Sequence, residues 1–206
     1  MRRVVLVHGA ATAPDVWEST TTALHGSAEV SCPERPQSGD LDTEVEFLAP
    51  LCAGAFVVGV SGGATLGLEL VARGVPVTGA VLHEPAAGSL MPGLLSHVAA
   101  GLEAGGVAGF GAALYGPAWD VSRTSATAET VAAEFAMFGA FEPAPLGERA
   151  ADVLLTVGER SPEARHDSVR ALCRFLGTRR QLVPGAGHAA HLENGSALAA
   201  LVPRTG

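Results

Sequence analysis

The stretch at residues 55–65 constrains the fold more than any other part of the chain. It reads Ala-Phe-Val-Val-Gly-Val-Ser-Gly-Gly-Ala-Thr, so a run of β-branched residues leads directly into a Gly-x-Ser-x-Gly pattern. Residues 63–73 follow with apolar residues at helical spacing, and Gly74 is placed to end that helix. The pattern predicts a buried strand that turns sharply into a helix, with Ser61 on the turn between them.

Gly59 and Gly63 flank this serine, one on each side. In a turn sharp enough to expose Ser61, a Cβ at either glycine would collide with neighbouring backbone. A serine hydroxyl is a poor nucleophile unless a base removes its proton and an acid orients that base. The chain contains 26 glycines, so the pattern alone is weak evidence. A catalytic interpretation therefore requires a histidine and a carboxylate elsewhere.

Length and charge limit the classes of protein to which the chain can belong. Its 206 residues suffice for one domain with a full core, and 48% of them are apolar against 17% charged. The net charge of −8 argues against a nucleic-acid partner, because no basic stripe exists to neutralise phosphates. The three cysteines form no Cys-x-x-Cys pair, so we expect no disulfide framework, no metal site and no other cofactor.

The sequence gives no sign of a targeting or membrane-spanning segment. Only a short apolar run precedes His8, which is too short for a signal peptide. No stretch reaches the ~18 unbroken apolar residues that a transmembrane helix requires. We therefore expect a cytoplasmic protein with a small-molecule substrate and no membrane partner, and the oligomeric state is left open.

Short β-branched runs alternate with longer helical patterns along most of the chain. Their near-continuous apolar character is typical of strands buried on both faces of a parallel sheet. The alternation indicates right-handed βαβ crossovers and therefore an α/β fold, with a mostly parallel six-stranded sheet flanked by helices. We predict strands at 3–7, 27–32, 55–60, 77–82, 153–157 and 180–183, and helices at about 14–24, 41–52, 62–73, 162–176 and 190–201.

The interval 86–150 breaks this alternation. It has no convincing strand, is rich in Ala and Gly, and carries aromatic residues that include Phe135, Phe138 and Phe141 at a spacing of three. Such an interval is too long for a structureless loop in a compact domain. We therefore expect a single domain over 1–206, in which 86–150 is an inserted helical cap over the carboxyl edge of the sheet. Its removal is expected to change substrate choice more than the stability of the sheet.

His188 is the candidate base. It follows a predicted strand and the Gly-rich turn of Pro-Gly-Ala-Gly-His. Loops at the carboxyl edge of a parallel sheet emerge on one side, so His188 can reach Ser61 there. A histidine pKa near ~6.5 suits proton transfer at neutral pH. His191, at the start of the last predicted helix, is expected to be structural or to support the site.

Together these motifs resemble those of the α/β-hydrolase superfamily, and the resemblance spans nearly the whole chain. The matching pieces are His8-Gly9-Ala10, Gly-Val-Ser-Gly-Gly at 59–63 and Gly-Ala-Gly-His at 185–188. The order nucleophile, acid, histidine also matches. The resemblance implies an α/β-hydrolase fold in which the backbone N–H groups of Ala10 and Gly62 form an oxyanion hole. It also implies that His8 supports the loop rather than the chemistry.

The acid is the point at which the chain departs from the family pattern. Family members usually place an aspartate in Gly-x-x-Asp after the penultimate strand, and here Ser161 holds that position. Our preferred acid is Glu84, at the end of the strand after the Ser61 helix, because some family members, haloalkane dehalogenases among them, carry a catalytic Glu at a similar place. Glu159 and Asp167 are the alternative acids. A further alternative is a dyad of Ser61 and His188 that works without an acid.

The sequence thus predicts a cofactor-free serine hydrolase in which His188 deprotonates Ser61 and Glu84 orients His188. The expected substrate is an uncharged ester, thioester or lactone of small to medium size and apolar character, because the aromatic residues of 86–150 could line an apolar pocket. The same fold supports other functions. One alternative is a non-hydrolytic lyase or biosynthetic cyclase, and another is a ligand-binding protein with a vestigial triad.

Overall fold

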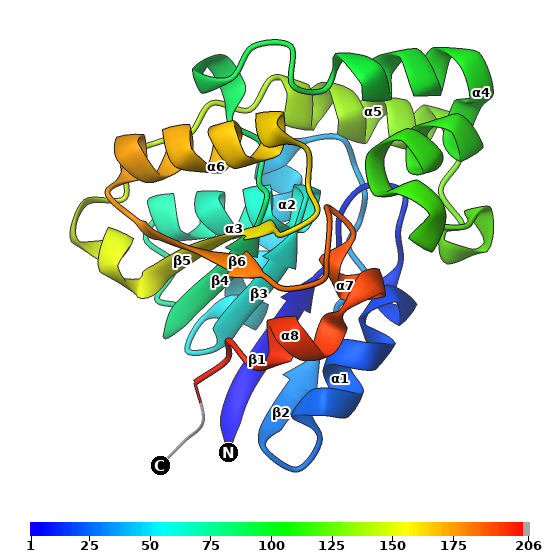
Figure 1. Ribbon diagram of the computed structural model, residues 1–206. Coiled ribbons are helices and arrows are strands. Elements are labelled where there is room, and N and C mark those ends of the chain that lie inside the picture. The colour runs from blue at the N-terminus through cyan, green and yellow to red at the C-terminus, as the bar shows by residue number, and fades with distance from the viewer. Residues whose placement is uncertain (204–206) are drawn as a thin grey trace.

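Six parallel strands form one sheet between two layers of helices in the computed structural model, which describes residues 1–203 (Figure 1). The spatial order is β2-β1-β3-β4-β5-β6, and every neighbouring pair is parallel. The α/β architecture and the six-stranded sheet expected from the sequence are therefore confirmed. The strands are β1 (Arg2–Val7), β2 (Ala28–Ser31), β3 (Phe56–Val60), β4 (Gly79–His83), β5 (Val153–Gly158) and β6 (Arg179–Val183).

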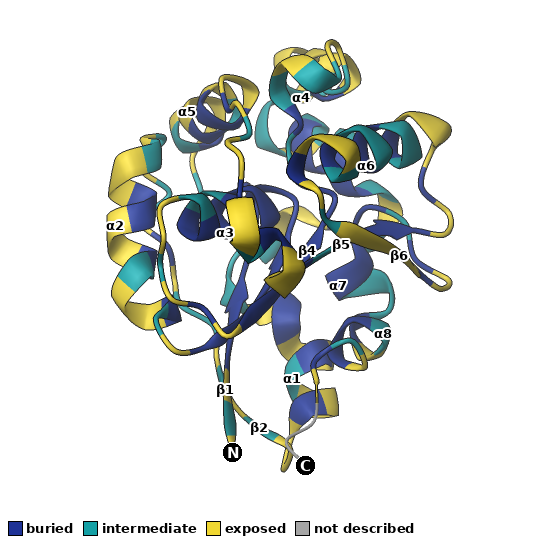
Figure 2. Cartoon of the chain, turned by 90° about the vertical axis from the view of Figure 1, so that its left-hand side faces the viewer, coloured by how far each residue is buried: buried dark blue, intermediate teal, exposed yellow. Residues whose placement is uncertain are grey.

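Helices pack on both faces of the sheet. Alternate strand residues enter two separate cores, with Val5 and Val57 in one and Val4 and Val58 in the other. The first core also receives α2, α3 and α6, and the second receives α1 and α8. Figure 2 shows β3 and β4 buried between helices whose outer sides are exposed, whereas the edge strand β6 is largely exposed. These helices are α1 (Glu18–Leu24), α2 (Leu41–Cys52), α3 (Gly62–Ala72), α6 (Glu163–Leu176), α7 (Ala190–Glu193) and α8 (Gly195–Ala199).

The segment 86–150 forms helices above the carboxyl ends of the strands (Figure 1). Within the described residues it contains no strand. Its α-helices are α4 (Ser96–Tyr115) and α5 (Ala128–Gly139). Short 3₁₀ turns occur here and once earlier in the chain: η1 (Pro14–Trp17), η2 (Gly88–Leu90), η3 (Gly116–Ala118), η4 (Val121–Arg123) and η5 (Gly147–Asp152).

Helix α4 is folded back on itself. By length and composition the stretch Ser96–Ala118 is the one helix within residues 1–203 that could cross a membrane, with a mean hydropathy of 1.3. Its backbone leaves the helical conformation at Gly105 (φ −139°) and Gly106 (φ 55°), so it does not form one straight helix of that length. The parts of α4 before and after these two glycines pack closely against each other, since a Cβ on Gly101 would lie 2.6 Å from the carbonyl oxygen of Gly109.

The core under this segment is continuous with the core of the sheet. Phe110, Tyr115 and Phe138 belong to the same cluster of buried residues as Val57 and Leu155 from the sheet. Deleting the segment would therefore expose apolar surface of the sheet itself. Removal of 86–150 is therefore expected to cost stability as well, and whether it changes substrate choice more than the stability of the sheet stays a prediction.

One predicted helix differs from the structure. The stretch 190–201 is divided into α7 and α8 at Asn194, whose backbone lies at φ −155°, ψ 63°. The Asn194 side chain accepts a hydrogen bond from the N–H of Ala197 at 3.3 Å and so caps α8. The apolar pattern continues across this break, and for that reason periodicity alone predicts one helix. The predicted helix at 14–24 likewise begins with the 3₁₀ turn η1.

The strand register brings the candidate residues to one edge of the sheet. In the pairing of β3 with β4, Val60 lies opposite His83, so Ser61 and Glu84 are the next residues on two adjacent strands. The N–H of Ser61 donates to the carbonyl oxygen of His83 at 2.9 Å. The predicted strand at 77–82 is one residue too short at this end, and the extension to His83 places Glu84 directly on the edge.

Candidate active site

Ser61 occupies a strained turn between β3 and α3. Its backbone lies at φ 56°, ψ −122°, a region that residues with a side chain rarely adopt and that costs about 1–3 kcal/mol. The turn depends on both flanking glycines. A Cβ on Gly63 would overlap the carbonyl of Val7, and a Cβ on Gly59 would overlap the carbonyl of Gly63. These overlaps explain why the Gly-x-Ser-x-Gly pattern has glycine at positions 59 and 63.

The carboxylate of Glu84 lies against the imidazole of His188. Glu84 Oε2 is 2.7 Å from His188 Nδ1. Its other oxygen, Oε1, accepts hydrogen bonds from the N–H of Gly158 at 2.9 Å and from the hydroxyl of Ser161 at 2.5 Å. Ser161, which stands where the family usually has its aspartate, therefore orients the carboxylate supplied by β4. Glu84 has a backbone φ of 48°, so it too sits in a strained turn.

Glu84 is ionised in this environment. Burial alone would raise the pKa of its carboxyl, but the hydrogen bond to His188 and the nearby His83 and Arg165 lower the pKa far below its usual range. A carboxylate can only accept, so the hydrogen-bonded Nδ1 of His188 must carry the proton. Nε2 is then the acceptor nitrogen of the ring.

His188 is neutral in this environment. Burial and the charge of Arg165 lower the pKa of its imidazole, while the hydrogen bond to Glu84 acts in the opposite direction. Its Nε2 is buried and has no hydrogen-bond partner within residues 1–203. The ring stacks on Tyr115, with centroids 5.6 Å apart and planes at 21°. Burial raises the pKa of Tyr115, whose hydroxyl lies against the loop that carries Ala10.

The two alternative acids lie elsewhere. Glu159 Oε2 accepts a hydrogen bond from the N–H of Gly185 at 2.8 Å, in an exposed turn. Asp167 pairs with Arg170 along α6. Neither carboxylate is hydrogen-bonded to His188, so Glu84 is the one acid of the three that the structure brings to the imidazole.

Ala10 and Gly62 lie side by side next to Ser61. Gly62 is the first residue of α3, so its N–H has no acceptor within the helix. The position that a Cβ on Gly62 would occupy is 3.3 Å from the nitrogen of Ala10. The site thus offers two backbone nitrogens, neighbours in space, beside the serine.

The loop that carries Ala10 is held by a buried cation. The guanidinium of Arg35 donates to the carbonyl oxygens of His8 and Gly9 at 3.0 and 3.1 Å. Its terminal nitrogens each lie 2.6 Å from a carboxylate oxygen, one of Glu44 and one of Glu134. All three charged side chains have no exposed surface. Glu134 belongs to α5, so this cluster joins the 86–150 segment to the loop.

Two aromatic residues of the 86–150 segment reinforce the same loop. The hydroxyl of Tyr115 donates to the carbonyl oxygen of Ala10 at 2.8 Å. The indole N–H of Trp119 donates to that of Ala11 at 2.9 Å. In the sequence, Tyr115 and Trp119 are two of several aromatic residues scattered through 86–150. The sole signal for Tyr115 is that it is the single tyrosine of the chain.

His8 and His191 are both buried and neutral. Burial lowers the pKa of His8 to about 3, and its Nδ1 lies 3.3 Å from the hydroxyl of Thr12. Burial also lowers the pKa of His191, whose ring lies 5.3 Å from that of Trp17 and 5.9 Å from that of Tyr115. These contacts are consistent with the expectation that His8 and His191 support the site structurally.

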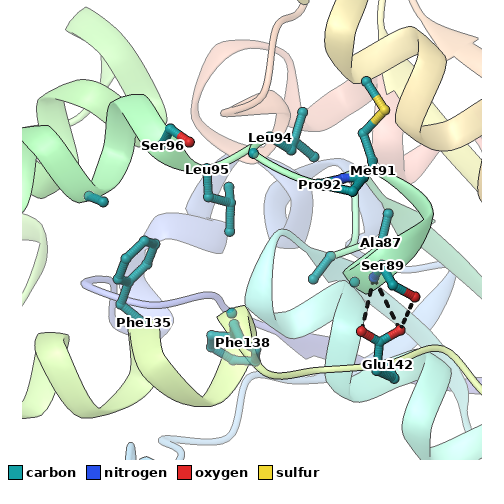
Figure 3. Close-up of a pocket in the computed structure, with 15 residues that line it drawn as sticks. Ala87, Ser89, Met91, Pro92, Leu94, Leu95, Ser96, Phe135, Phe138 and Glu142 are labelled. Atoms are coloured by element: carbon teal, nitrogen blue, oxygen red, sulfur yellow. Dashed lines mark hydrogen bonds between the residues drawn. The ribbon is translucent and has the colours of Figure 1, made fainter.

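A small cavity of about 30 Å³ adjoins Ser61. It continues toward a larger groove of about 440 Å³ between α4, α5 and the loop after β4, with which it shares Ala86, Leu95, Phe135 and Phe138. Figure 3 shows this groove with its apolar side chains and with Glu142 hydrogen-bonded to Ser89. Within residues 1–203 no three His, Cys, Asp or Glu side chains gather as metal ligands would.

The fold and the site define the class of the protein. The chain belongs to the alpha/beta hydrolase family, which matches it over residues 4–201, and it is an α/β-fold hydrolase. The resemblance expected from the sequence motifs is confirmed.

Solved structures support the same fold. An alpha/beta hydrolase from Sphaerobacter thermophilus is 25% identical, with a TM-score of 0.64 over 89% of this chain and 84% of that one. MenH from S. aureus is 14% identical, with a TM-score of 0.72 over 98% and 91%. A thermophilic esterase from Thermogutta terrifontis is 18% identical, with a TM-score of 0.70 over 98% and 88%. Comparison with curated proteins found no match.

Proposed function

We propose that the protein hydrolyses an ester, thioester or lactone of small to medium size through an acyl-enzyme on Ser61. The observation that carries the proposal is the 2.7 Å contact between Glu84 and His188, which makes Nε2 the acceptor nitrogen of the imidazole, while Glu84 and Ser61 line one cavity. The apolar groove beyond this site supports a substrate whose larger part is apolar.

Each residue has a defined role in the proposed reaction. His188 Nε2 takes the proton of Ser61, and the Ser61 oxygen forms a bond to the substrate carbonyl carbon. The N–H groups of Ala10 and Gly62 stabilise the resulting oxyanion. As the bond to the leaving alcohol or thiol breaks, His188 returns the proton to that group. Water, deprotonated by His188, then attacks the acyl-enzyme and releases Ser61 with the acid product.

Glu84 and the 86–150 segment have positioning roles in this scheme. Glu84 fixes the tautomer of His188 and stabilises the imidazolium formed in each half-reaction. The segment 86–150 is proposed to act as the cap of a single domain, because α4 and α5 line the groove and hold the loop that carries Ala10. The scheme requires no cofactor.

Rapid mixing with an activated ester tests the proposal. We expect 4-nitrophenyl acetate to release a burst of about one equivalent of 4-nitrophenolate per chain, followed by slower turnover, since activated esters acylate such serines faster than water removes the acyl group. Stopped-flow absorbance measures the burst. A lyase, a cyclase or a ligand-binding protein would give no burst and no acylated chain in the mass spectrum of the quenched mixture, and that result would contradict the proposal.

A further inference from the structure

Arg165 is a buried cation that the proposed chemistry does not use. It lies in the first turn of α6, and its side chain is 7% exposed. Its Nε is 3.7 Å from Glu84 Oε2, close enough for charge attraction but too long for a hydrogen bond. Within residues 1–203 its guanidinium donates no hydrogen bond to any group. The donors of this guanidinium therefore have no protein acceptor in the described part of the chain and can bind water or a ligand.

The other buried arginine shows what a satisfied guanidinium looks like in this chain. Arg35 donates to two carbonyl oxygens and binds two carboxylates at once, those of Glu44 and Glu134. Arg165 has one carboxylate, Glu84, near its Nε and nothing on its other donors. The Arg165 guanidinium can therefore stay next to Glu84 and still bind a second carboxylate, by donating hydrogen bonds from its other edge.

The unused donors are next to the reacting centre. Arg165 lines the same cavity of about 30 Å³ as Ser61, Ala10 and Gly62. A space of this size holds a water molecule or two, which is also the scale of one carboxylate group. Arg165 lines this cavity, and within residues 1–203 none of its nitrogens is both fully enclosed and without a partner, so its donors are open to a ligand.

We propose that Arg165 binds a carboxylate carried by the acyl part of the substrate. The enzyme would then act on a half-ester, a half-thioester or a lactone that carries a carboxylate, and charge-assisted hydrogen bonds from the guanidinium would hold that carboxylate. This inference rests on the proposed acyl transfer at Ser61. It replaces the expectation of a wholly uncharged substrate.

The distribution of charge decides which end of the substrate carries the anion. The larger groove is lined by small and apolar residues, and its one charged side chain is Glu142, a carboxylate. That groove suits the leaving group, which must depart after acylation. The small cavity is lined by both Glu84 and Arg165. Because the Glu84 carboxylate already has hydrogen-bond partners in His188, Gly158 and Ser161, the guanidinium is the charged group that can bind a substrate anion there, and the cavity suits the acyl group that stays on Ser61.

Two esters with acyl chains of equal length test the inference. Mono-4-nitrophenyl glutarate carries the anion, and 4-nitrophenyl pentanoate lacks it. We expect the natural protein to prefer the glutarate ester in kcat/KM, and Arg165→Gln to lower that value about 10- to 100-fold, mainly through KM. The pentanoate ester should lose at least about 10-fold less than the glutarate ester, because any effect of the Arg165 charge on the pKa of His188 acts on both esters alike. Arg165→Lys should recover part of the glutarate preference because it restores the charge without the planar geometry.

A matched control and a binding measurement complete the test. Arg160→Gln removes an arginine from the loop before α6 that pairs with Glu193 at the surface, and it should leave the ester preference unchanged. Calorimetric titration with monomethyl glutarate, in a Ser61→Ala background that cannot hydrolyse it, should show binding that Arg165→Gln weakens at least about 10-fold and Arg160→Gln does not.

The outcomes separate the inference from the proposed function. If Arg165→Gln lowers the rates of both esters equally, or if the natural protein prefers the pentanoate ester, Arg165 serves only as a counter-ion of Glu84 and the inference is wrong. If neither ester is hydrolysed but glutarate binding depends on Arg165, the anion site stands and the hydrolase proposal fails. Binding that is absent or independent of Arg165 overturns the anion site in either case.

Discussion

Replacing Glu84 with glutamine is expected to lower kcat by as much as ~10⁴-fold while the fold is retained, the loss known for the equivalent change in a serine protease triad. The amide keeps the shape of the side chain but has no charge to stabilise the imidazolium of His188. Its NH₂ group can also turn toward Nδ1 and favour the wrong tautomer, in which Nε2 carries the proton. Ester hydrolysis under saturating substrate measures the effect, and circular dichroism checks the fold.

Glu159→Gln is the matched control for that prediction. Glu159 contacts the N–H of Gly185 in an exposed turn, so its replacement should change kcat by less than about 3-fold. A Glu84→Gln variant with nearly full activity would show that Glu84 is a structural carboxylate. An activity loss in Glu159→Gln instead would move the acid to a residue that the structure does not bring to His188.

Replacing Arg35 with methionine is expected to lower the free energy of unfolding by about 3–5 kcal/mol. The substitution leaves Glu44 and Glu134 as buried carboxylates with no cation between them. It also removes the donors to the carbonyl oxygens of His8 and Gly9. Urea unfolding followed by fluorescence measures the change.

An exposed arginine provides the comparison. Arg73 also pairs with two carboxylates, Asp42 and Glu69, but its side chain is 36% exposed. Arg73→Met should therefore cost at most about 1 kcal/mol. If Arg35→Met were as mild as Arg73→Met, the buried cluster would not be what holds the loop that carries Ala10.

Local sequence patterns predict the parts of the site that depend on backbone geometry. Gly59 and Gly63 predict the turn at Ser61 because the overlap they avoid lies within a few residues of the turn or on the neighbouring strand. The position of Glu84 follows from the end of one strand, and the parallel register then places it beside Ser61. The sequence predicts the ends of strands and helices less accurately. An example is the helix predicted at 190–201, which the structure divides at Asn194.

Contacts between distant segments could not be predicted in this way. Arg35 meets Glu134 across 99 residues, and neither has a local pattern that differs from an ordinary surface charge. Tyr115 reads as one aromatic residue among several until the fold brings it to Ala10 and His188. Arg165 is similar, because an arginine in the first turn of an amphipathic helix is normally exposed. Its burial depends on how α6 packs beside Glu84.

The central claim is that Ser61 is the nucleophile, and intact-protein mass spectrometry after treatment with a fluorophosphonate probe tests it most directly. The account predicts one adduct per chain, located on the peptide that contains Ser61, and no adduct in a folded Ser61→Ala variant. An adduct on a different serine, or an unlabelled natural protein that is correctly folded, would contradict it.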